Sequence, residues 1–166
     1  MLIRINNFVI WKIIYNFAEQ KKEEIMVITE DTIREKFRKF NSDYFNKALP
    51  LPKFTLLHSY RYLGYFLCDK IIGKRKLKHP EIKISDYYDW DETELDNVII
   101  HEMIHYYLAY KHLDNNLTHG DEFVKMADKL NKEYGFHISE RIDTSNYKRQ
   151  KNAPKLGWFL THYLFN

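Results

Sequence analysis

The stretch that decides the fold runs from Val98 to Tyr110 and reads VIIHEMIHYYLAY. Ten of its thirteen residues are apolar or aromatic, and the three exceptions are His101, Glu102 and His105. A helix that is apolar nearly all the way round belongs in a protein interior. Burying two imidazoles and a carboxylate there is costly unless they are paired or coordinate a metal ion. The stretch therefore predicts a buried helix whose polar side chains have a specific purpose.

The spacing His-Glu-x-x-His indicates what that purpose is. Residues four apart lie on one face of a helix, so His101 and His105 can ligate the same ion. Glu102 then lies beside the ion and can act as a base toward metal-activated water. The alternative is a helix whose two histidines are held by hydrogen bonds inside an ordinary core. A purely structural metal site has no need of the carboxylate, which favours a hydrolytic site.

A catalytic zinc takes three protein ligands and keeps one position open. The candidates for the third ligand follow the motif: His112, His119, His137 and Glu122. His112 comes seven residues after His105, about two turns along a continuing helix, which is beyond coordination reach. His119 is favoured, because the polar loop after Lys111 lets the chain reverse and Gly120 permits close backbone approach. The other two candidates stay open.

Composition limits the class of protein. The chain has 166 residues, 45% of them hydrophobic and 16% aromatic, which predicts one folded domain with a sizeable core. A net charge of +3 is too small to indicate nucleic-acid binding by itself. The single cysteine, Cys68, excludes a disulfide framework within the chain and a zinc site made of several thiolates. One unpaired cysteine fits a reducing compartment, so we expect a cytoplasmic protein.

Residues 1–28 form an N-terminal extension in this interpretation. The apolar run from Met1 to Phe17 is interrupted by polar and charged residues and lacks a small-residue cleavage site, unlike a signal peptide. It is also too short to span a bilayer, so no membrane association is expected. The extension either packs as an amphipathic helix or precedes a natural start at Met26.

The rest of the pattern predicts an α+β fold. Helical periodicity runs from Thr29 to Ala48, with the stretch Leu49–Pro52 as its stop. Strands are expected at Phe54–His58, Arg61–Cys68 and Glu81–Ser85. Gly64 inside the second strand indicates a bulge or a close approach. The third strand alternates polar and apolar residues, and its charged outward positions suggest the edge of the sheet.

Two further helices complete the order of elements. Asp91 and Glu94 have the spacing of a capping box that opens the central helix. Another helix begins near His119 and carries an apolar stripe that includes Phe123, and Gly135 is its natural stop.

Two basic segments lie outside these elements. Lys70–Lys78 carries five cationic residues around Gly73 and is most simply a solvated hairpin connection. Arg141–Lys155 is also basic, and it begins a tail, residues 141–166, that ends in aromatic residues. The alternative is that both segments contact DNA phosphates.

The motifs together resemble the SprT-like family of zinc metalloproteases. The most specific part of the resemblance is His101–His105 followed by His119–Phe123. Three upstream stretches also resemble the family: Phe45–Pro50, Leu63–Phe66 and Ile82–Ser85. The resemblance covers about Thr29 to Phe136 and places a metalloprotease domain at residues 29–140.

The resemblance implies a zincin-like fold, with a small mixed or antiparallel sheet packed on the motif helix and flanking helices. It implies that His101, His105 and His119 bind Zn²⁺ and that Glu102 is the general base for hydrolysis of peptide bonds in a protein substrate. In Spartan-like members the substrates are proteins bound or crosslinked to DNA. Many bacterial members carry a C-terminal zinc ribbon with paired cysteines, and this chain has no cysteine after Cys68. The alternative function is a non-catalytic, zinc-stabilised module that binds DNA or protein.

Overall fold

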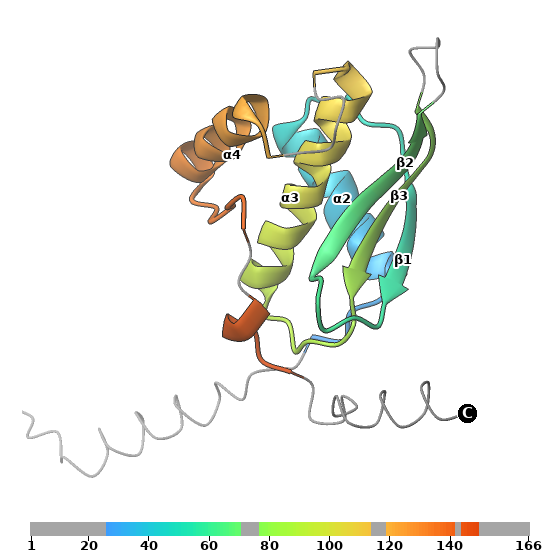
Figure 1. Ribbon diagram of the computed structural model, residues 1–166, viewed down its shortest axis with the longest axis vertical. Helices are drawn as coiled ribbons and strands as arrows, with labels where there is room; N and C mark the ends of the chain where they lie inside the picture. The colour runs from blue at the N-terminus through green and yellow to red at the C-terminus, as the bar shows by residue number, and fades with distance from the viewer. Residues whose placement is uncertain (1–25, 71–76, 114–118, 142–143, 150–166) are drawn as a thin grey trace, which may run out of the picture.

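The computed structural model describes residues 26–70, 77–113, 119–141 and 144–149. These residues form three helices, three strands and one short 3₁₀ helix (Figure 1). In chain order they are α2 (Glu30–Tyr44), β1 (Lys53–Leu57), β2 (Gly64–Lys70), β3 (Leu77–Ser85), α3 (Glu92–Lys111), α4 (Asp121–Tyr134) and η1 (Thr144–Asn146). The predicted α+β class and the small mixed sheet are confirmed. No helix within the described ranges has both the length and the apolar character needed to cross a lipid bilayer.

The sheet has the strand order β1-β3-β2. Strand β1 runs parallel to β3, and β2 runs antiparallel to it. The prediction that Glu81–Ser85 lies at a sheet edge is therefore wrong, because this segment belongs to the central strand. Its residue Lys83 pairs with Thr55 on one side and with Tyr65 on the other. The alternation of polar and apolar residues shows that one face of the strand is solvated, and it does not show how many neighbours the strand has.

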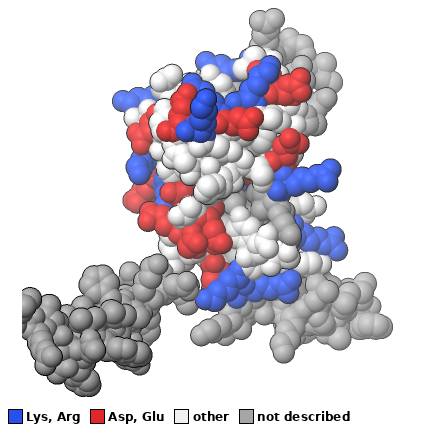
Figure 2. Space-filling model, turned by 90° about the vertical axis from the view of Figure 1, so that its left-hand side faces the viewer, with Lys and Arg blue, Asp and Glu red and all other residues white. Residues whose placement is uncertain are grey.

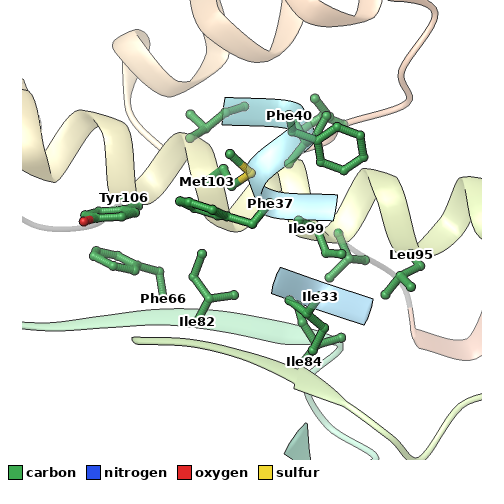
Figure 3. Packing of buried hydrophobic residues seen from close by; sticks show 14 of the residues in the cluster. Ile33, Phe37, Phe40, Phe66, Ile82, Ile84, Leu95, Ile99, Met103 and Tyr106 are labelled. Carbon is green, nitrogen blue, oxygen red and sulfur yellow. The ribbon is translucent and has the colours of Figure 1, made fainter. Parts of the chain in front are cut away.

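Helix α3 lies between the sheet and α4, with α2 packed beside it (Figure 1). Apolar side chains from α2, β3 and α3 meet between the sheet and the helices, as Figure 3 shows for Phe37, Ile82 and Ile99. Ile82 and Ile99 are fully buried. Because α3 has neighbours on several sides, its burial extends nearly all the way round, as predicted from the sequence.

The predicted capping box at the start of α3 is confirmed. The backbone N–H of Glu94 donates to Asp91 Oδ1 at 2.7 Å, and the Glu94 side chain accepts from the backbone N–H of Asp91. Gly135 ends α4 in the left-handed region, with φ 75°, also as predicted. The central helix is longer than the motif that predicted it, because its first turns begin at this cap.

Helix α2 is shorter than the predicted Thr29–Ala48. Thr29 caps its start, and the helix ends at Tyr44. The chain then turns through Asn46 and Lys47, which have φ of 52° and 55°. The left-handed region ends a helix in the way a C-cap does, so α2 stops before it reaches the prolines.

Gly64 lies where the backbone of β2 approaches its neighbours closely. A Cβ at this position would lie 3.0 Å from the carbonyl oxygen of Lys83 and 3.1 Å from Cγ1 of Val98. The expected close approach is confirmed, and the irregularity in strand pairing falls further along, between Leu67 and Asp69. Lys70 and Leu77 pair across the antiparallel strands, so Lys70–Lys78 joins a hairpin, as predicted. Most of that loop, residues 1–25 and residues 150–166 fall outside the described residues.

Candidate metal centre

Three imidazoles converge beside α3. His101 and His105 project from the helix, and His119 stands two residues before the start of α4. The Nε2 atom of His119 lies 3.0 Å from Nε2 of His101 and 3.1 Å from Nε2 of His105. Zinc–nitrogen bonds of about 2.0–2.1 Å in a tetrahedral site place ligand atoms roughly 3.3 Å apart. Nε2 of His119 therefore has the spacing of a ligand that shares one ion with each of the other two, and the group of three could hold a metal.

The other candidates for a third ligand lie elsewhere. His112 is the exposed C-cap of α3 and adopts a left-handed conformation. Glu122 is on the first turn of α4, where its carboxylate pairs with Lys125 at 2.7 Å. His137 is exposed, and its backbone N–H donates to Asn97. In the part of the chain that the structure describes, His119 alone joins the motif histidines in a cluster of possible ligands.

Phe123 forms one wall of the histidine cluster. Its ring centroid lies 4.8 Å from that of His101 and 4.7 Å from those of His105 and His119. Sequence reasoning placed this residue on the apolar stripe of its helix and in the stretch His119–Phe123, and gave it no role at the metal site. The available signal was its position in the first turn of α4, four residues after His119. Phe123 is 1% exposed, so it shields the imidazoles from water.

The charge state of His101 follows from its surroundings. Burial, which is the largest cause, and the neighbouring His105 and His119 together lower the pKa of His101 to about 3. A hydrogen bond to the backbone of Ser139 opposes this shift, which identifies the imidazole as the donor and the Ser139 carbonyl as the acceptor. His101 is therefore neutral near pH 7, the form that coordinates a metal ion.

Glu102 is buried, with 4% of its surface exposed. Burial raises the pKa of Glu102 to about 8, even though a hydrogen bond from the backbone N–H of Phe66 in β2 acts in the opposite direction. A divalent cation nearby would stabilise the carboxylate and lower this pKa. Glu102 is thus a carboxyl group whose proton affinity is tuned toward neutrality, which suits a general base.

A cavity of about 310 Å³ opens beside His101. Its lining includes the buried residues Val98 and Ile138. The lining also includes polar residues, among them Asn97, His137 and Arg141. The cluster is therefore adjacent to a space that a ligand or a substrate side chain can occupy.

The comparisons with known proteins agree with this geometry. The model of the SprT-like family matches residues 33–145, which is more than half of the chain and includes all three histidines. The chain belongs to the SprT-like family. No curated protein matches the chain significantly.

Proposed function

We propose that this SprT-like protein is a zinc-dependent metallopeptidase that hydrolyses peptide bonds in protein substrates. The observation that carries the proposal is the buried carboxylate of Glu102, which directly follows one of three converging imidazoles. A structural zinc site is closed by four protein ligands and needs no neighbouring base. Three nitrogen ligands with an adjacent carboxylate are typical of a hydrolytic centre.

The residues present fit zinc by their chemistry. Imidazole nitrogens suit Zn²⁺, and three of them leave one coordination position for water or substrate. When bound, zinc supplies a Lewis acid that acidifies water and polarises a carbonyl group. His101, His105 and His119 would hold the ion, and Phe123 excludes water from one side of their rings.

Glu102 moves the proton in the proposed reaction. Its carboxylate accepts a proton from the attacking water as the water oxygen bonds to the scissile carbonyl carbon. The same carboxyl group then donates that proton to the leaving nitrogen as the carbon–nitrogen bond breaks. The hydrogen bond from Phe66 holds the carboxylate in place between β2 and the histidines.

Strand β2 is the edge that can hold an extended substrate. The sequence suggested Ile82–Ser85 for this role, but that segment lies in the centre of the sheet. Within the described residues β2 pairs with β3 alone, and its Phe66 contacts the proposed base. An extended peptide that adds beside β2 through backbone hydrogen bonds would pass close to Glu102.

DNA binding and a cytoplasmic location stay predictions. In the upper part of the face seen in Figure 2, basic and acidic side chains lie next to each other, so this area has no patch of a single sign. The basic segments Lys70–Lys78 and Arg141–Lys155 are the proposed contacts with DNA. We expect an affinity for DNA that falls with salt and falls again when Lys74, Arg75 and Lys76 are neutralised.

A cleavage assay with Glu102→Gln tests the proposed function. The zinc-loaded protein is incubated with an unstructured protein such as casein, with and without DNA. The variant should keep its zinc and lose about 10²–10⁴-fold in rate, because the proton acceptor is gone. Glu92→Gln is the matched control, because it also removes one negative charge from α3, but at an exposed position in the first turn. Full activity in Glu102→Gln, or purified protein that binds no zinc, would contradict the proposal.

A further inference from the structure

The segment that follows α4 is held by one side chain that bonds to both backbone groups of a single residue. The Asn131 side chain accepts a hydrogen bond from the backbone N–H of Ile138 and donates one to the Ile138 carbonyl, both at 2.8 Å. One amide thus satisfies both backbone groups of a single residue, as a neighbouring strand would. Ile138 itself is buried, with 6% of its surface exposed. The segment is therefore fixed to α4 by both geometry and burial.

The residues on either side of Ile138 are fixed to α3. The backbone N–H of His137 donates to Oδ1 of Asn97 at 2.8 Å. Ser139 and His101 line the same cavity, where the Ser139 backbone accepts a hydrogen bond from the His101 imidazole. Three consecutive residues are thus joined in turn to α3, to α4 and to a proposed metal ligand. Asn97 lies one helical turn before His101, so the connections close a ring around this ligand.

We propose that Asn131 and Asn97 are positioning residues of the metal centre. By fixing the backbone of residues 137–139, they hold the Ser139 carbonyl against His101. The carbonyl in turn sets the ring orientation and the tautomer that leave Nε2 facing His119 and the ion. The inference rests on the proposed function only in taking zinc as the ion, because the hydrogen bonds belong to the chain itself.

The chemistry of the two asparagines differs in a way that can be tested. Asn131 uses both its acceptor and its donor, so aspartate at this position would lose the donor and face the Ile138 carbonyl with a second acceptor. Asn97 uses its Oδ1 acceptor toward His137. Aspartate at position 97 keeps that acceptor, whereas leucine removes it. Aspartate should therefore disrupt the arrangement at position 131 and preserve it at position 97.

The chain contains a matched control for Asn131. Asn41 in α2 makes the same pair of hydrogen bonds with Leu49, donating to its carbonyl at 2.8 Å and accepting from its N–H at 3.1 Å. Both pairs are partly buried. Leu49 follows α2, and the described hydrogen bonds of Asn41 lead to no histidine of the cluster. Equal damage to the fold is thus expected from Asn41→Asp and Asn131→Asp.

The experiment measures zinc affinity by competition with a chromophoric chelator and records the absorption spectrum of the cobalt-substituted protein. Asn131→Asp and Asn97→Leu should bind zinc about 10–100-fold more weakly and shift the cobalt spectrum. Asn41→Asp and Asn97→Asp should keep wild-type affinity and spectrum. Chelator-treated samples give the stability of each fold by denaturant unfolding, so a general loss of folding is recognised.

Two results would overturn the inference. One is zinc affinity in Asn131→Asp that equals that of Asn41→Asp. The other is equal zinc affinity in Asn97→Leu and Asn97→Asp, and this pair decides alone if Asn131→Asp does not fold. Neither result depends on cleavage. If Glu102→Gln proved fully active, the peptidase proposal would fail and the positioning inference would be unaffected. If the zinc affinities contradicted the positioning inference, the peptidase proposal would be unaffected.

Discussion

This molecule has two interiors, an apolar one and a polar one, that are buried to a similar degree. Burial stabilises the side chains of the first and disfavours the charged forms of the side chains of the second. Between the sheet and the helices, Ile82 and Ile99 are fully buried among other apolar side chains, and burial stabilises them. On another side of α3, His101 and Glu102 are 6% and 4% exposed, and burial works against their charged forms. The first interior holds the fold together by itself. The second is a cost to the fold that a bound ion would offset, so the two should respond differently to metal, to mutation and to pH.

Removal of the ion should give the largest contrast between the two interiors. With free zinc at a thousand times its dissociation constant, the wild-type protein should gain about 4 kcal/mol of stability. His119→Ala should lose most of that gain, because two ligands remain from the three. Ile99→Ala should keep it. Denaturant unfolding with zinc and with a chelator measures the gain, and a zinc effect of wild-type size in His119→Ala would place the ion elsewhere.

Truncation in the apolar interior should have the next largest effect. Ile99→Ala should lower the free energy of unfolding by about 2–5 kcal/mol, through lost burial and the cavity left behind. The loss should be the same with zinc and with chelator, because Ile99 supports the fold and not the ligands. Thr93→Ala on an exposed position of the same helix is the control and should change stability by about 0.5 kcal/mol or less. If the free energy of unfolding of Ile99→Ala fell only in the presence of zinc, the two interiors would not differ in the way proposed.

The sequence predicts local features of both interiors well. The run of apolar residues around the motif predicts a helix buried on all sides, and the spacing of its histidines predicts that they share a face. The polar loop before Gly120 predicts that the chain returns, and the structure brings His119 to the other two imidazoles. These features depend on residues close together in the chain, where helix geometry leaves few alternatives.

Features that depend on distant partners were not predictable. Alternation in Glu81–Ser85 identifies a solvated face, but pairing with β1 depends on residues far upstream, so the strand was wrongly placed at an edge. The hydrogen bond that Phe66 donates to Glu102 comes from another element in the same way. The double hydrogen bond of Asn131 also has no local pattern, since asparagine near a helix end is ordinary. Tertiary packing decides each of these.

The pH dependence of stability provides the finest distinction between the interiors. In the metal-free protein the pKa of Glu102 is raised to about 8 from an ordinary value of 4.5. Between these values the folded state holds a proton that the unfolded chain releases, so stability falls as pH rises, by at most about 1.4 kcal/mol per pH unit. Glu102→Gln cannot titrate, so the variant should become progressively more stable than wild type from about pH 5 to pH 8.

Histidine protonation changes the stability of each protein with the opposite sign. The pKa of His101 is lowered to about 3, so stability is lost as pH falls below the ordinary value of 6.5, and it is lost in both proteins alike. The difference between wild type and Glu102→Gln therefore isolates the carboxyl group. Denaturant unfolding in chelator at several pH values measures it, with Glu92→Gln as the exposed control. Bound zinc should shrink the difference, because the cation stabilises the carboxylate. A difference that does not change with pH would mean that Glu102 folds in its charged form and is not tuned by burial.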